Sequence, residues 1–393
     1  MRSFFHWLAQ VAVVTRFNLY GLPERKGAAA AAVFGIAGVV AVLVGMLSIA
    51  QGFRRVMTAG GSPDVALVMR NGADTEMTSI MRKEETRIIA CAPGVVAASA
   101  ELYVSLELPK RSTGTDANIP LRGIESPAFR VRRGFRLRQG RQFQPGRNEV
   151  IVGCAAAAEF RGLDLGARLD VNGQPWTIVG LFSEDGASAE SEIWADTSLL
   201  QGAYQRGTSF QSVHVKLASA AAFDDFKSAL AADPRLNVKV VRETDYYAEQ
   251  SRVVTNLVTT LGTLVAALMG IGAAFGCLNT MYTAVAARTR EIATLRALGF
   301  GGGAVALSVL AESLALALAG GAAGGGAAYL MFDGYRAATM NMQSFNQVAF
   351  GFAVTPSLLA EGLIYALMIG FLGGLFPALR AARQPVASAL REL

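Results

Sequence analysis

The sequence has very few residues of the kinds that build disulfide scaffolds and metal clusters. Its 393 residues include 3 cysteines and 2 histidines. Charged side chains are also scarce, at 17% of the chain against about 25% in an average soluble domain. Apolar residue types, counted with tyrosine, reach 52%. The composition argues against a disulfide-stapled, zinc-binding, disordered or purely soluble protein, and it favours membrane spans.

Four stretches are long and apolar enough to cross a membrane as helices: residues 27–53, 251–287, 303–332 and 358–379. Each reaches the roughly 20 residues that span a hydrocarbon core of about 30 Å. The second stretch contains 35 consecutive residues without charge, which is longer than a bilayer requires. We therefore expect it to continue beyond the membrane as a stalk.

Lysine and arginine predict the orientation, because cytoplasmic loops carry an excess of them. Of the 36 such residues, 25 lie between Phe53 and Val253, where the uncharged run of the second span begins, which leaves 11. Ten of the 11 fall in the two ends of the chain or in the loop 288–302, and one, Arg336, falls in the loop 333–357. Both termini and the loop 288–302 are therefore expected in the cytoplasm. The net charge of +6 has this topogenic explanation, so no nucleic-acid partner is expected.

Residues 54–250 are expected outside the cytoplasm as an α+β domain inserted between the first two helices. Two strand–helix–strand patterns flank a β-rich stretch at about 119–200 and suggest two related βαβ-like lobes with an insertion. Helices are expected at 77–91 and 220–232. Asn172-Gly173 predicts a hairpin. His214 alternates with Val213 and Val215, so it is expected to face solvent.

The loop 288–302 has the pattern of a short two-faced helix. Ile292, Leu295 and Leu298 fall on one stripe, while Arg290, Thr294 and Ala297 fall on another. Such a helix between two spans can lie at the membrane surface and present its polar face to a cytoplasmic partner. The alternative is a connector whose charges only set the topology.

ATP hydrolysis by the residues of this sequence is excluded, because a P-loop requires glycine, lysine and serine or threonine in succession. Of the six lysines, only Lys227 precedes a serine, and Phe226 stands where glycine is required. We expect no cofactor bound by this chain.

Several motifs resemble the permease domain of ABC transporters of the macrolide-exporter (MacB) and cell-division (FtsX) superfamily. They are Leu278-Asn279-Thr280-Met281, the run from Arg288 to Gly299, Glu312 followed by Gly320-Gly321, the tail from Phe376-Pro377 to Arg391, and, more loosely, Gly140-Arg141-Gln142-Phe143 with Glu149-Val150-Ile151-Val152. The resemblance covers nearly the whole chain.

The resemblance implies a multi-pass permease subunit of the bacterial inner membrane. A separate ATPase dimer would carry ATP and Mg²⁺, and its clamping would move the outer domain by mechanotransmission, exporting an amphiphilic substrate or a lipoprotein. A second permease chain, a periplasmic adaptor and membrane lipid are the other implied partners. The alternative is an FtsX-like signal transducer that controls a periplasmic hydrolase without transport. By resemblance, the loop helix docks on the ATPase through Arg288, Thr289, Arg290, Glu291, Ile292, Thr294, Leu295 and Arg296.

Four weaker patterns complete the expectations. Six arginines offer a patch for an anionic lipid or partner, although a solvated strand pair is the commoner explanation: Arg130, Arg132, Arg133, Arg136, Arg138 and Arg141. Small residues in the third span permit close helix packing: Gly320, Gly321, Gly324 and Gly325. Cys91 and Cys154 either pair or stay free thiols. An interfacial helix is expected within 1–26, and a cytoplasmic tail at 380–393.

Overall fold

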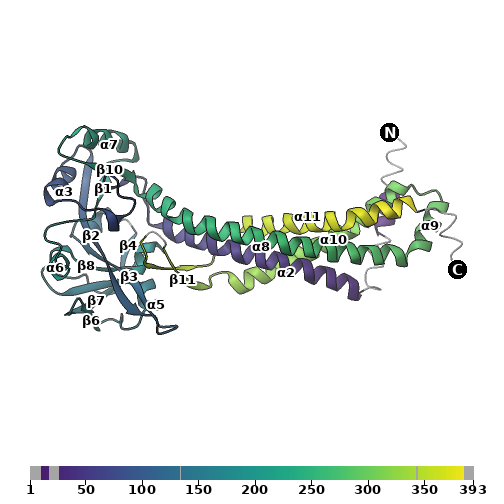
Figure 1. Cartoon of the computed structure of the whole chain (residues 1–393), viewed down its shortest axis with the longest axis horizontal. Helices are drawn as coiled ribbons and strands as arrows, with labels where there is room; N and C mark the ends of the chain where they lie inside the picture. Colours follow the sequence, from purple (N-terminus) through teal and green to yellow (C-terminus); the bar gives the residue numbers. More distant parts are fainter. Residues whose placement is uncertain (1–9, 17–25, 133, 342–343, 385–393) are drawn as a thin grey trace. The chain divides into compact units, whose positions relative to one another are not determined.

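The computed structural model describes residues 10–16, 26–132, 134–341 and 344–384, and these separate into two compact units (Figure 1). The helix unit comprises Met1–Ala50, Leu257–Tyr335 and Phe352–Leu393, and the sheet unit comprises Gln51–Asn256 and Arg336–Gly351. The expected interfacial helix and cytoplasmic tail fall largely outside the described residues. Of these segments, residues 10–16 are helical, and the helix that begins at Pro356 continues to Arg383.

Within the described residues, four helices are long and apolar enough to cross a membrane: α2 (Lys26–Ala59), α8 (Glu243–Ala287), α10 (Gly302–Phe332) and α11 (Pro356–Arg383). α11 begins with two standard start signals: the Thr355 hydroxyl accepts a hydrogen bond from the Leu358 amide at 3.3 Å, and Pro356 occupies the first turn. α8 is 45 residues long, as the long uncharged run predicts. The short helix α9 (Thr289–Ala297) connects α8 to α10.

Glycines on α10 let two other helices approach closely. A Cβ at Gly324 would lie 2.3 Å from the Ala37 carbonyl oxygen, and one at Gly320 would lie 2.9 Å from the Ile36 Cβ, both on α2. The glycines one position further along face α11 instead: a Cβ at Gly321 would lie 2.8 Å from the Ala366 Cβ. The stripe of small residues thus serves two helix contacts at once, which larger side chains would prevent.

The sheet unit is built on two strand–helix–strand units whose strands alternate in one antiparallel sheet. The first unit is β1 (Val65–Arg70), α3 (Lys83–Ala90) and β2 (Val95–Pro109), and the second is β9 (Ser212–Leu217), α7 (Phe223–Ala232) and β10 (Val238–Arg242). Their order is β10-β1-β9-β2, a split βαβ arrangement of the ferredoxin-like type. The two expected strand–helix–strand patterns therefore share one sheet, because β9 fills the gap that the first crossover leaves between β1 and β2.

The stretch between β2 and β9 extends the same sheet in the order β3-β8-β5-β7-β4, with β6 paired to β7. The strands are β3 (Asp116–Ile124), β4 (Phe135–Gly140), β5 (Glu149–Gly153), β6 (Arg168–Val171), β7 (Gln174–Glu184) and β8 (Ile193–Asp196), and the short helices are α4 (Ala128–Val131), α5 (Cys154–Glu159) and α6 (Thr197–Ala203). Asn172 and Gly173 have φ of 52° and 81°, which confirms the predicted hairpin.

One expected helix is interrupted. Residues 77–91 form the 3₁₀ turn η2 (Glu76–Thr78) and then α3, with an extended segment between them. The break follows from local capping: the Arg82 amide donates to the Glu85 carboxylate at 2.7 Å and so starts a new helix. Another 3₁₀ turn, η3 (Ser188–Ser191), precedes β8. Cys91 and Cys154 are free thiols, so the disulfide alternative is wrong.

The loop between α10 and α11 contains a hairpin that belongs to the sheet unit. β11 (Arg336–Met340) pairs antiparallel with β12 (Gln347–Gly351). The buried Asn346 side chain donates to the Tyr103 hydroxyl at 3.2 Å, and its carbonyl oxygen accepts from the Ser105 hydroxyl at 2.9 Å. The hairpin is thereby fixed to β2 through buried polar contacts.

Candidate functional site

The helix α9, expected as the docking element, has a buried and an exposed face. Ile292 and Ala293 are 6% and 3% exposed. Ile292 packs in one apolar cluster with Val285 of α8, Val309 of α10 and Ala381 of α11. Three long helices of the helix unit therefore anchor α9, which lies at one end of the bundle (Figure 1).

The apolar stripe is shorter than the sequence indicates. Leu295 is half-buried, whereas Leu298 is 73% exposed. The physical reason is the end of the helix: α9 stops at Ala297, and Gly299 takes a left-handed φ of 96° that turns the chain away.

Three of the expected docking residues point inward and hold α9 in place. The Arg288 guanidinium contacts Glu312 of α10, with Nη1 3.2 Å from Oε2. Arg296 donates from Nη1 to the carbonyl oxygen of Gln384 at the end of α11, and the Gln384 amide donates to the Thr289 hydroxyl at 3.3 Å. These side chains fix the helix to its own chain.

The remaining polar side chains form the exposed face. Arg290, Glu291 and Thr294 are exposed. Glu291 lies in the first turn and Arg296 in the last, which matches the helix macrodipole at both ends. The exposed face therefore combines both signs of charge with a hydroxyl, on a helix whose opposite face is apolar.

The six arginines expected as a patch do not share one surface. Arg132 is buried, with Nη2 2.8 Å from Oε2 of Glu101. Arg141 forms a two-point pair with Glu149 at 2.6 and 2.7 Å. Arg136 lies 3.6 Å from Asp185, and Arg138 donates to Ser183. Arg130 is exposed. Arg133 lies outside the described residues.

A second candidate site is a network of buried charges inside the sheet unit. It comprises five carboxylates and three basic side chains: Glu76, Glu101, Glu184, Glu192, Glu243, Arg122, Arg132 and His214. Arg122, on β3, lies at its centre: Nη1 is 2.8 Å from both Glu76 and Glu101, and Nε is 2.7 Å from Glu192. A cluster of charges can stay buried only where opposite charges pair with one another, because isolated charges are costly to bury.

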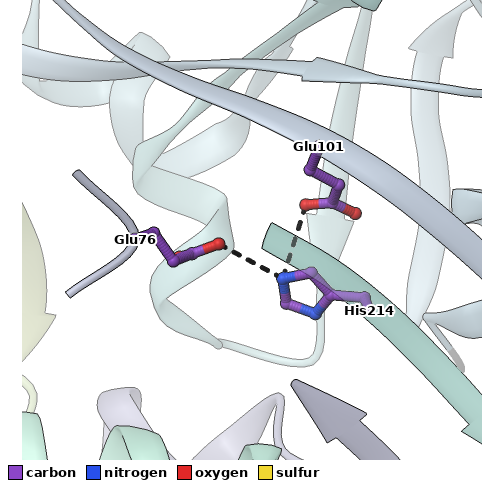
Figure 2. A group of neighbouring side chains, drawn as sticks. All are labelled: Glu76, Glu101 and His214. Atoms are coloured by element: carbon purple, nitrogen blue, oxygen red, sulfur yellow. Dashed lines mark hydrogen bonds and ion pairs between the residues drawn. The ribbon is translucent and has the colours of Figure 1, made fainter. Parts of the chain in front are cut away.

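His214 lies close to three of these carboxylates. Its Nε2 lies 3.4 Å from Glu76 and 3.5 Å from Glu101 (Figure 2). Its Nδ1 lies 3.3 Å from Glu243. Burial alone would lower the pKa of His214, but the charge of Glu101 and the close contacts with Glu243 and Glu76 raise the pKa to about 9. The imidazole is therefore a cation at neutral pH. The expectation that His214 faces solvent is wrong, since it is 0% exposed.

The carboxylates respond in two ways. Burial would raise the pKa of Glu76, but attraction to Arg122 and the bond from His214 outweigh burial and hold the pKa well below its usual value. For Glu184, burial prevails over the attraction of Arg132, 4.0 Å away, and raises the pKa to about 7. One member of the network therefore titrates near neutrality, while Glu76 stays ionised.

Glu76, Glu101 and His214 also have the residue types and spacing of a cation site, with ligand atoms within 4.8 Å of one another. Two features oppose it. A cation would compete with Arg122 for the same two carboxylate oxygens and would lie close to its positive charge. It would also need the unprotonated imidazole, whose pKa is raised to about 9. The guanidinium and imidazolium together fulfil the role that a metal would have.

This network is not predicted from the sequence, although two patterns point toward it. The alternating pattern correctly places the side chain of His214 on the opposite sheet face from Val213 and Val215. The two valines pack against α3 and α7. The alternating pattern cannot reveal that the His214 face is covered as well. The stronger signal is Arg122, which follows Leu121 in a strand that is buried from Ile119 to Ile124. A charge in such a run calls for a buried partner.

Comparison with known proteins assigns both parts of the chain. Residues 29–233 match the family model described as MacB-like periplasmic core domain, and residues 263–386 match the model described as FtsX-like permease C-terminal. The chain is 27% identical over 317 residues to an uncharacterized ABC transporter permease, YknZ, of Bacillus subtilis strain 168, covering 76% of this chain and 75% of that protein.

The chain is also similar to a macrolide export ATP-binding/permease protein, MacB 1/2, of Paracoccus denitrificans strain Pd 1222. The identity is 25% over 416 residues, covering 98% of this chain and 59% of the relative's length. Among solved structures, the extracellular domain of the ABC-type transporter YknZ from Gram-positive bacteria aligns with a TM-score of 0.36 at 21% identity, over 45% of this chain and 99% of that one.

Proposed function

Because the chain belongs to the ABC transporter permease family defined by the MacB-like periplasmic core domain and the FtsX-like permease region, we propose that it is the membrane-spanning subunit of an ATP-driven export system. A separate ATP-binding subunit docks on α9 from the cytoplasm. The four apolar helices cross the inner membrane with both termini cytoplasmic, and the sheet unit lies in the periplasm. A second permease chain completes the pair that the ATPase dimer drives.

The single observation that carries this proposal is the geometry of α9. Its apolar side is anchored by Ile292 among three long helices, and its outer side exposes Arg290, Glu291 and Thr294. A rigidly held helix with a mixed-charge outer face is suited to transmit force from a partner, because the partner's movement is not lost in a loose loop. Mechanotransmission through the long helices to the sheet unit then moves an amphiphilic cargo.

The charged network supports the mechanical part of the proposal. Ion pairs within the sheet unit join several segments of the chain. They connect Arg122 and Arg132 of the inserted stretch with Glu101 of β2, and His214 of β9 with Glu243 at the start of α8. Force that arrives along α8 would therefore act on several strands together rather than on one.

Site-specific photo-crosslinking tests the docking step. A photoreactive phenylalanine analogue replaces Thr294, on the exposed face, or Ala293, which is 3% exposed. In the cells that naturally make this chain, we expect an adduct with an ATP-binding subunit from position 294 and little or none from position 293. Adducts from neither position, or equally from both, would contradict docking through this face.

A further inference from the structure

A buried ion pair joins the start of α9 to α10. Nη1 of Arg288 lies 3.2 Å from Oε2 of Glu312, and the two side chains are only 9% and 5% exposed. Arg288 is the residue between the last turn of α8 and the first turn of α9. The pair therefore lies where the chain changes direction from one helix into the next.

The pair borders a small cavity of about 10 Å³ whose lining is mostly apolar. Met281 and Val285 of α8, Ile292 of α9 and Val309 of α10 contribute to the lining, and Glu291 of α9 also reaches it. A single water requires roughly that much room, so the cavity holds one water at most beside the two charges. Each charge depends on nearby protein groups, because a buried ion without a partner is strongly destabilised.

The ion pair adds direction to an otherwise apolar contact. Ile292 packs against Val305 and Val309 of α10 in the same cluster, and apolar contacts of this kind allow sliding. A charge-assisted bond between two buried side chains restrains sliding, since it is directional.

We propose that Glu312 is a positioning residue for coupling: through Arg288 it makes α9 and α10 move as one body. This inference rests on the proposed function, in which α9 receives the movement of the ATPase. That movement then enters the bundle through α10 as well as through α8. A permease without the Glu312 carboxylate still binds the ATPase, but it transmits the movement poorly.

Spin-label distance measurements test the one-body claim without any partner. Nitroxides are placed at Thr294→Cys on α9 and Leu318→Cys on α10, both exposed positions. Cys91 and Cys154 are changed to serine, and the buried Cys277 is kept. In lipid nanodiscs we expect a narrow distance distribution with Glu312, a distribution at least twice as broad in Glu312→Gln, and a narrow one again in the swapped pair Arg288→Glu with Glu312→Arg.

The matched control is Glu361→Gln, which removes an exposed acid on α11 and should leave the distribution narrow. An unchanged width in Glu312→Gln, or equal broadening in Glu361→Gln, overturns the proposal. If Glu312→Gln does not fold, the swapped pair decides: a narrow distribution supports the proposal, and a broad or unfolded one overturns it.

A second measurement separates positioning from stability. The affinity-tagged chain is purified from the cells that naturally make it, and ATP turnover is measured per retained ATP-binding subunit. We expect Glu312→Gln to retain the ATPase at the wild-type level while turnover that depends on the permease falls at least tenfold. Wild-type turnover in this variant contradicts the inference. If even the wild-type chain retains no ATPase, the proposed function fails, while the distance measurement still decides the one-body claim.

Discussion

Arg122 and Glu192 form a two-point ion pair in the interior of the sheet unit, with Nε 2.7 Å from one carboxylate oxygen and Nη2 2.9 Å from the other. The opposite edge of the same guanidinium donates to Glu76 and Glu101. The side chain is 1% exposed. One arginine thus neutralises carboxylates from three separate segments of the chain, which makes it the centre of the buried network.

Replacing Arg122 with methionine should destabilise the sheet unit severely. The change leaves Glu76, Glu101 and Glu192 buried without their main cation, and breaking a buried pair on one side costs about 3–5 kcal/mol. Unfolding of the full chain is followed by the fluorescence of Trp176 and Trp194, both buried in this unit. The control is Arg111→Met, whose pair with Asp164 is largely exposed and should contribute less than about 1 kcal/mol. Equal losses in both variants would refute the central role of Arg122.

His214 should make the free energy of unfolding depend on pH in the alkaline range. Its pKa is raised to about 9 in the folded chain and is about 6.5 when unfolded, so the folded state holds the proton more tightly. Its stabilisation is complete below about pH 6.5 and is lost as the pH rises through about 9. Glu184, whose pKa is raised to about 7, acts with the same sign at lower pH, so the comparison uses a Glu184→Gln background.

In that background, the free energy of unfolding should fall between about pH 7 and pH 9.5 when His214 is present. The variant His214→Phe should be less stable at pH 7 and nearly independent of pH in this window. Chemical denaturation at each pH, with the tryptophan signal, measures both slopes. The same slope with and without His214 would show that the imidazole is not charged in the folded protein.

Replacing either of two nearby glycines of α10 with alanine should change the stability of the protein in opposite directions. A Cβ at Gly324 would lie 2.3 Å from the Ala37 carbonyl oxygen, whereas nothing lies within 4 Å of one at Gly326. Gly324→Ala should separate α10 from α2 and cost about 1–3 kcal/mol. Gly326→Ala should be neutral or stabilising, because alanine favours a helix by about 0.5–1 kcal/mol. Thermal unfolding in one detergent compares them, and equal midpoints would contradict the close approach.

The sequence predicts the long helices, the Asn172-Gly173 hairpin and the two-faced helix α9, because each depends on local periodicity or local backbone preference. It does not predict that β9 lies between β1 and β2, since this pairing joins segments more than 100 residues apart. The sequence also does not predict which way a side chain of a short helix points. Arg288 and Arg290 have similar sequence surroundings, yet Arg288 contacts Glu312 whereas Arg290 lies on the exposed face.

The buried network eluded prediction for a related reason. Glu76, Arg122 and His214 come from three distant segments, and each alone resembles an ordinary polar position of a strand or turn. Only the fold brings them together, and only then do their pKa shifts arise. Arg132 is an example. In the sequence it lies in a cluster of arginines, whereas in the structure it forms a buried ion pair with Glu101.

The central claim, that the outer face of α9 is the docking surface for the ATPase, is tested most directly by retention of that subunit on the affinity-tagged chain. Glu291→Arg reverses an exposed charge on α9, and Glu107→Arg reverses an exposed charge in the sheet unit. If Glu291 pairs with the ATPase, its reversal should weaken binding by about 2–5 kcal/mol. The account predicts that Glu291→Arg loses most of the ATPase in detergent, while Glu107→Arg retains the wild-type amount. Equal, undiminished retention in both variants would contradict it.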